Sequence, residues 1–147
     1  MALHKTMKQI KFTKEGLDQV KIEYENLKSS RLAAVKELSR ARELGDLSEN
    51  GLYHAAKSNL RSIDSRLRRL LSMIKLAVVV PSKKILVLQE GEKIEYEIVG
   101  DFEADPVRHK ISANSPIGSS LSGKQPGDII EIQTPSGKKN LTILKVI

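Results

Sequence analysis

Residues 53–74 read YHAAKSNLRSIDSRLRRLLSMI, and their apolar side chains recur in alternating steps of three and four. The positions that share this seam are Tyr53, Ala56, Leu60, Ile63, Leu67, Leu70 and Ile74. Such spacing places all of them on one stripe of an α-helix, as in the heptads of a coiled coil. The pattern therefore predicts a long helix with one buried stripe, ending at about Lys75.

A second seam of the same kind precedes it, in residues 17–41. Its apolar and small members are Leu17, Val20, Tyr24, Leu27, Ala34, Leu38 and Ala41. Arg31 stands where the spacing expects an inward residue, and we interpret it as a side chain whose stem packs inward while its charged end reaches water. Thr13 is predicted to cap the start of this helix, and Gly45 to end it in a left-handed conformation.

Only a few residues around Gly45 join the two predicted helices, so each apolar stripe can cover the other. This arrangement is an antiparallel helical hairpin, predicted over residues 11–76. At about 1.5 Å per residue, an arm of about thirty residues extends about 45 Å. The sequence thus predicts a projection with its tip near residues 45–51.

After Leu76 the sequence changes to short stretches rich in β-branched residues, which are typical of strands. These stretches are residues 78–80, 85–88, 94–99, 110–113, 128–132 and 141–146. Ser115 and Pro116 before residues 117–121 indicate a short helix with its cap and first-turn proline. The prediction is an α+β protein, with a small sheet domain over residues 77–147 and a basic, partly flexible lead-in over residues 1–10.

The composition excludes several classes of protein. The chain has no cysteine, which excludes disulfides, thiolate nucleophiles and cysteine-based metal sites. No apolar run is long enough to span a bilayer, so we expect a cytoplasmic protein without a membrane partner. A net charge of +7 favours a polyanionic partner, such as nucleic acid or a machine bound to it. The aromatic content of 3% disfavours an exposed platform for stacking bases.

The predicted tip, residues 45–51, reads GDLSENG and carries two carboxylates, Asp46 and Glu49. On spacing alone, the favoured interpretation is a capping box in which Asp46 caps the second helix. The alternative is that both carboxylates bind a hard divalent cation such as Mg²⁺, which prefers oxygen ligands. Two ligands make a weak site, so another macromolecule would have to complete it. That alternative predicts an accessory factor rather than a free-standing enzyme.

The tip belongs to the run ARELGDLSEN at residues 41–50, followed by YHAAK at residues 53–57. Together these runs resemble the hairpin-tip signature of bacterial Gre transcription elongation factors, a family of transcript cleavage factors, and are closest to its GreA branch. The second half agrees, with IVGD at residues 98–101, EAD at 103–105 and NSPIG at 114–118. The resemblance covers most of the chain from about residue 8.

This resemblance implies that the C-terminal domain is FKBP-like and that the hairpin enters the secondary channel of bacterial RNA polymerase. There Asp46 and Glu49 would act in catalysis by holding a magnesium ion that the free protein lacks and shares with the polymerase. The polymerase would then cut the 3′ end of its backtracked nascent RNA. The chain would be a monomer when free and no enzyme by itself, because the nuclease activity belongs to the polymerase.

Other implied roles carry alternatives. Lys57, with Arg61 as a weaker addition, falls where the family contacts RNA and polymerase, although a solvated helix face explains Lys57 equally well. His54 is interpreted as structural. For a group in the second domain, turn and cap roles are favoured over polymerase contact: Asp101, Glu103, Asp105, Asn114, Ser115 and Pro116. Ser48 and Leu52 depart from the family's usual basic and acidic residues, which leaves the strength of cleavage stimulation open.

Three other functions are considered. The main alternative is a Gre-like regulator that occupies the same channel and inhibits or competes without stimulating cleavage. The intact acidic pair at the tip weighs against it. A peptidyl-prolyl isomerase is suggested only by analogy of fold, which is a weak argument for function. A coiled-coil adaptor outside transcription would bind through its side faces and be indifferent to the tip.

Overall fold

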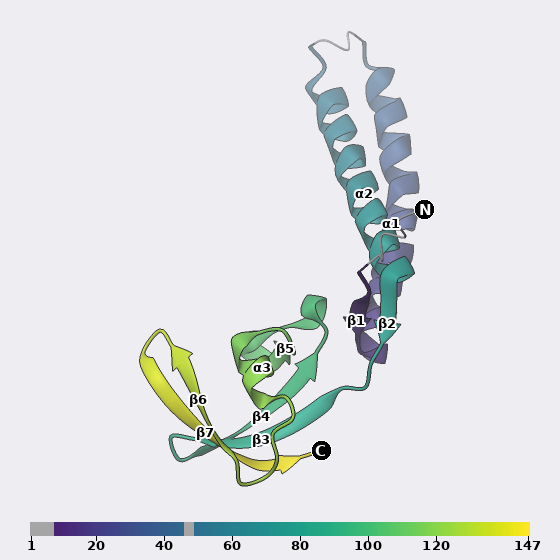
Figure 1. Ribbon diagram of the computed structural model, residues 1–147. Helices are drawn as coiled ribbons and strands as arrows, with labels where there is room; N and C mark the ends of the chain where they lie inside the picture. Colours follow the sequence, from purple (N-terminus) through teal and green to yellow (C-terminus); the bar gives the residue numbers. More distant parts are fainter. Residues whose placement is uncertain (1–7, 46–48) are drawn as a thin grey trace, which may run out of the picture. The chain divides into compact units, whose positions relative to one another are not determined.

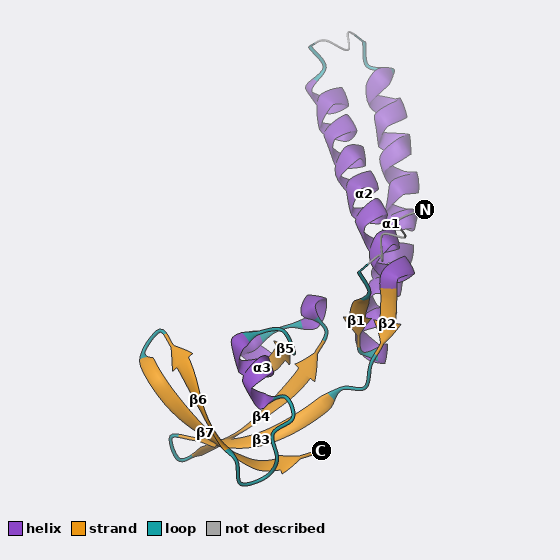
Figure 2. Cartoon of the chain, viewed as in Figure 1, coloured by secondary structure: helices purple, strands orange, loops and turns teal. Residues whose placement is uncertain are grey.

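The computed structural model describes residues 8–45 and 49–147, which divide into two compact units (Figure 1). The hairpin unit is Leu17–Leu76. The sheet unit comprises the described residues up to Gly16 together with Ala77–Ile147. Helices dominate the first unit and strands the second, as Figure 2 shows. In the described part of the chain, no helix is both long and apolar enough to cross a bilayer.

Two long helices, α1 (Lys14–Arg42) and α2 (Gly51–Leu76), form the hairpin (Figure 1). Both predicted seams are covered: Ala34, Ala41, Tyr53 and Leu70 are buried, and the other seam residues except Arg31 are half-buried. The predicted antiparallel helical hairpin is therefore confirmed. Each helix buries a stripe that would be exposed if it stood alone, so the two stabilise each other.

Arg31 has a partner that its sequence position did not reveal. Its Nε donates to Oδ1 of Asp64 on the other helix at 2.6 Å. The charged end of Arg31 is exposed, as the interpretation of this side chain expected, and it also forms an interhelical ion pair. This hydrogen bond lowers the pKa of Asp64, and the carboxylate raises the pKa of Arg31. A second such pair joins Glu23 to Arg66 at 2.7 Å.

The sheet unit contains a five-stranded sheet with the order β5-β4-β3-β7-β6. Its strands are β3 (Lys83–Gln89), β4 (Glu92–Val99), β5 (Lys110–Ser112), β6 (Ile129–Thr134) and β7 (Gly137–Val146). Neighbours are antiparallel except β4 and β5, which run parallel. The short helix α3 (Pro116–Leu121) packs against β5 and β6. The predicted α+β class, with a sheet domain and one short helix after the hairpin, is confirmed.

The core of the sheet unit lies on one face of this sheet, under α3. Its buried members are Ile85, Val87, Tyr96, Ile111, Leu121, Ile130, Ile132, Leu141 and Ile143. Along β3, β6 and β7 these residues alternate with more exposed ones, which is the pattern of a sheet with one buried face. Burial of its ring raises the pKa of Tyr96, because the phenolate is poorly solvated there.

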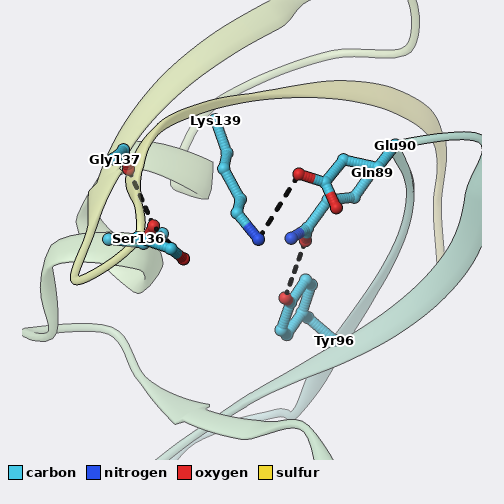
Figure 3. A network of polar contacts seen from close by, with 7 residues as sticks. Gln89, Glu90, Tyr96, Ser136, Gly137 and Lys139 are labelled. Carbon is cyan, nitrogen blue, oxygen red and sulfur yellow. Dashed lines mark hydrogen bonds and ion pairs between the residues drawn. The ribbon is translucent and has the colours of Figure 1, made fainter.

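Polar contacts join the turn after β3 to β7 (Figure 3). Lys139 Nζ lies 3.4 Å from Glu90 Oε1, and Tyr96 O–H donates to Gln89 Oε1 at 3.4 Å. At the turn between β6 and β7, the hydroxyl of Thr134 donates to the carbonyl oxygen of Gly137 at 2.7 Å. These contacts stabilise the two turns of the sheet.

The sequence analysis did not predict the strand β1 (Ile10–Phe12), which pairs in parallel with β2 (Ala77–Val79). Through this pairing the structure assigns the described residues up to Gly16 to the sheet unit, whereas the sequence analysis placed residues 11–16 with the hairpin. A strand of three residues is too short to show an alternating pattern, so its partner becomes apparent only after folding.

Candidate functional site: the hairpin tip

Helix α1 ends in a turn that glycine makes possible. The amide of Glu43 donates to Ser39 O and that of Leu44 to Ala41 O, both at 3.3 Å. Gly45 then has a positive φ of 118°, a conformation that residues with a Cβ rarely adopt. Gly45 therefore acts as the predicted stop after the helix.

Asn50 closes the hairpin at the tip by bonding to both helices. Its Nδ2 donates to the carbonyl oxygen of Ala41 at 2.6 Å, and its Oδ1 accepts the amide of Tyr53 at 3.0 Å. The second bond makes Asn50 the N-cap of α2, which begins at Gly51. The sequence analysis missed this residue, although an asparagine directly before the first helical residue is a recognised capping signal.

The cap of α2 bears on the two interpretations of the acidic pair. Helix α2 begins at Gly51 under the cap of Asn50, so Asn50 fills the capping role among the described residues. Asp46 and Ser48 lie outside the described residues, so the capping and the metal-binding interpretations of Asp46 both stay predictions. Glu49 is exposed directly before the cap, and no contact between described residues involves its carboxylate.

The tip alone does not complete a metal site among the residues that the structure describes. In that part of the chain no group of three or more His, Cys, Asp or Glu side chains could hold a metal ion. An exposed carboxylate such as Glu49 has the donor chemistry that a hard cation prefers, but one or two carboxylates leave most of its coordination shell open. The predicted magnesium therefore remains a prediction that needs ligands from a partner.

Basic and aromatic side chains gather one turn behind the tip. The buried ring of Tyr53 has Arg42 Cζ from α1 and Lys57 Nζ from α2 each 5.8 Å from its centroid. The ring of His54 meets Tyr53 edge-on at 5.5 Å, which supports a structural role for this histidine. Lys57 is half-buried, so an ordinary solvated face does not fully describe it. Arg61, one turn further along α2, is exposed.

Arg42 was not singled out in the sequence analysis. Arg42 lies on α1 but contacts the ring of Tyr53 on α2, so no spacing along α1 predicts this contact. The cluster of Arg42, Tyr53 and Lys57 holds two cations over one ring, with Arg42 on the last turn of α1 and Tyr53 on the first turn of α2. Each cation gains electrostatic attraction from the ring face.

The motif residues of the sheet unit mostly satisfy one another. Asp101 accepts hydrogen bonds from the hydroxyl of Ser112 and from Asn114 Nδ2, the latter at 3.1 Å to Oδ1. Ser115 caps α3 by accepting the amide of Gly118 at 3.1 Å. Pro116 is the first residue of that helix, and the backbone of Asp105 pairs with that of Lys110. Turn and cap roles are thus confirmed for Asp101, Asn114 and Ser115.

Comparison with known proteins agrees with this architecture. The family model "Transcription elongation factor, N-terminal" matches residues 10–79, and the model "Transcription elongation factor, GreA/GreB, C-term" matches residues 76–147. Transcription elongation factor GreA of a Nitratiruptor species is 40% identical over 147 residues, covering 91% of this chain and 90% of that protein. GreA of Geobacillus kaustophilus is 39% identical over 153 residues, covering 95% and 97%.

Among solved structures, the crystal structure of GreA factor homolog 1 of Thermus thermophilus covers 95% of this chain and 99% of its own, at 24% identity and a TM-score of 0.47. At these values the structural likeness adds nothing to the assignment, which depends on the family models and the relatives in sequence. Both halves of the chain match, in order and over nearly their full length. The chain therefore belongs to the GreA/GreB family of transcription elongation factors.

Proposed function

We propose that this protein is a transcription elongation factor that inserts its hairpin into the secondary channel of bacterial RNA polymerase. There it stimulates the polymerase's own cleavage of backtracked nascent RNA and so rescues arrested complexes. The observation that carries the proposal is the exposed carboxylate of Glu49 at the closed end of the hairpin, where Asn50 does the capping. Family membership and the names of the relatives support the same activity.

The hairpin is suited to carrying such a group at the far end of two long helices. Helix α1 has 29 residues and α2 has 26, which at about 1.5 Å per residue gives arms of about 40 Å. The two helices cover each other's seams and are joined by the ion pairs Arg31–Asp64 and Glu23–Arg66. A paired arm bends less than a single helix, so the side chains at its tip are presented in a restricted region of space.

In this proposal Asp46 and Glu49 supply carboxylate oxygens to a magnesium ion whose other ligands come from the polymerase. When bound, the ion would polarise the scissile phosphate and activate a water. The contribution of this chain is to bring two further carboxylates to that ion. The factor acts as a single copy and is not itself a nuclease.

Lys57 and Arg61 would contact the RNA displaced during backtracking, or the polymerase beside it. Both lie on α2 behind the tip, and the basic side chains attract phosphate groups over several ångströms. The ring of Tyr53 lies 5.8 Å from the Lys57 ammonium, which restricts the lysine's rotamers and holds its charge near the tip. Arg42 adds a second cation on the other helix.

The test is to add the purified protein to a defined backtracked elongation complex and to measure the release of short 3′ RNA fragments. Wild-type protein should release them, and the protein alone should leave free RNA intact. The double variant Asp46→Asn with Glu49→Gln should fold normally, since Asn50 caps α2, but should lose stimulation. Glu43→Gln removes an exposed carboxylate near the end of α1 and serves as the matched control.

Three results would change the assignment. Undiminished cleavage with the double variant would remove both carboxylates from the catalytic role. Inhibition of RNA synthesis by wild-type protein without any fragments would favour the Gre-like regulator that competes for the channel. Loss of cleavage with Glu43→Gln as well would show that charge anywhere near the tip, rather than the acidic pair, is what counts.

A further inference from the structure

The carboxylate of Glu103 lies against the N-terminus of α1. Glu103 belongs to the 3-10 helix η1 (Asp101–Glu103) of the sheet unit. Its Oε2 accepts the amide of Thr13 at 2.8 Å and that of Gly100 at 3.0 Å, and its Oε1 accepts the hydroxyl of Thr13. Thr13 Oγ1 in turn accepts the amide of Gly16 at 3.1 Å, which confirms Thr13 as the N-cap. One side chain thus links segments that are 90 positions apart.

Two glycines make this close approach possible. A Cβ on Gly16 would overlap Glu103 Oε1, and a Cβ on Gly100 would overlap the backbone oxygen of Lys11. Neither glycine has the positive φ that explains glycine in a turn. Their lack of a side chain instead leaves room for the carboxylate and for the backbone of β1.

The contact is partly shielded from water by its neighbours. Thr13 is 7% exposed and Phe12 fully buried, with the Phe12 ring stacked on that of Phe102 at 6.2 Å between centroids. The amide of Val80 donates to the carbonyl oxygen of Phe12 at 2.8 Å, which brings the end of β2 to the same place. Hydrogen bonds to an ionised carboxylate are stronger than neutral ones, and a negative charge at a helix N-terminus is favourable.

We propose that Glu103 is a positioning residue that caps the first turn of α1 within the sheet unit and holds that turn closed. Helix α1 runs without interruption from Lys14 to Arg42, but its first residues, up to Gly16, belong to the sheet unit. The first amides of a helix have no partner within it. Thr13 Oγ1 accepts one of them, the amide of Gly16, and Glu103 in turn holds Thr13 by accepting its amide and its hydroxyl. Without this carboxylate the first turn of α1 would open more often.

The consequence for cleavage rests on the proposed function above. A factor whose first turn of α1 opens more often must lose more conformational freedom when it engages the polymerase, so more of it is needed for half-maximal cleavage. The maximal rate should not change, because the acidic tip is untouched. A shift in concentration without a loss of plateau therefore distinguishes positioning from chemistry.

The first test measures amide hydrogen exchange in the full-length protein with Glu103→Gln. The matched control is Glu15→Gln, which removes an exposed carboxylate from the same first turn of α1. Exchange at Thr13 and Gly16 should be about tenfold faster with Glu103→Gln. It should be at most about twofold faster with Glu15→Gln, because an exposed carboxylate has only a weak effect at a helix N-terminus. Equal exchange in the two variants would overturn the proposal. Should Glu103→Gln fail to fold, Thr13→Val against Thr13→Ser makes the same comparison.

The second test is a cleavage titration with the same two variants. Glu103→Gln should raise the half-maximal concentration several-fold at an unchanged plateau, and a lowered plateau or no shift would overturn the positioning role. The exchange measurement needs no polymerase. If wild-type protein releases no fragments, the proposed function fails, and exchange alone still decides whether Glu103 holds the first turn of α1 closed.

Discussion

Replacing Asn50 by alanine should loosen the tip of the hairpin by a predictable amount. The change removes two hydrogen bonds, from Nδ2 to Ala41 O at 2.6 Å and from the Tyr53 amide to Oδ1 at 3.0 Å. Loss of an N-cap costs about 1 kcal/mol, and loss of a further hydrogen bond about 1 kcal/mol. The expected total is therefore about 2 kcal/mol against opening of the first turn of α2.

Asn50→Ser separates the two contributions. Serine caps a helix about as well as asparagine, but its side chain is too short to reach Ala41 as well. It should therefore lose only the bond to α1, about 1 kcal/mol. Asn59→Ala provides a control for the chemical change, because Asn59 is exposed on the same helix and away from its end. It should leave the tip as it is.

Hydrogen exchange at the amide of His54 gives the readout. This amide donates to the backbone oxygen of Asn50 at 3.1 Å, so its bond survives in each variant and its exchange reports opening of the turn. At about 1.4 kcal/mol per tenfold change, exchange should be roughly thirtyfold faster with Asn50→Ala and about fivefold faster with Asn50→Ser. Identical exchange with alanine and serine would refute the claim that Asn50 joins the two helices.

The remaining predictions concern charge and packing. The Arg31–Asp64 bond lowers the pKa of Asp64 in the folded protein. The stabilising effect of this bond is therefore present above the ordinary carboxyl pKa of about 4, and it is lost as the pH falls through the lower pKa of the folded state. The urea midpoints of wild type and Asp64→Asn should converge as the pH falls below about 4. Leu141→Ala, at a fully buried position, should cost about 3 kcal/mol in urea unfolding, whereas Ile129→Ala, 68% exposed, should cost about 0.5 kcal/mol or less, and equal costs would contradict the assigned core. In a plot of the logarithm of the half-maximal concentration for cleavage against the logarithm of the salt concentration, Lys57→Ala should lower the slope by about 0.7, with no change in the saturated rate. Parallel salt curves for the two proteins would remove Lys57 from the RNA contacts.

The hairpin could be predicted because its signals are local. Residues three and four apart lie on one face of a helix, so the seam from Tyr53 to Ile74 implies a buried stripe before any partner is known. The short link at Gly45 then brings the two stripes together. Strands with β-branched residues, and the cap of α3 at Ser115, follow from similarly short-range rules. The same spacing marked Arg31 as exceptional but could not identify Asp64, which lies 33 positions away.

At the tip, the sequence analysis identified the segment that joins the helices but did not single out the cap at Asn50. Asp46 with Glu49 and Asn50 before Gly51 are both acceptable capping patterns, and they differ by only a few tenths of a kcal/mol in local preference. The carbonyl of Ala41 on the other helix favours Asn50, since that side chain bonds to both helices. The cations around Tyr53 likewise come from two helices.

By itself the sequence determined that two amphipathic helices precede a small sheet domain, and that an acidic segment lies between those helices. The tertiary structure alone decided that Asn50 caps α2, that β1 pairs with β2, and that Glu103 holds the start of α1. The physical reason is the range of the interactions. Helical periodicity arises between near neighbours along the chain. A carboxylate that bonds to an amide 90 positions away can do so only after the intervening chain has folded and brought the two groups together.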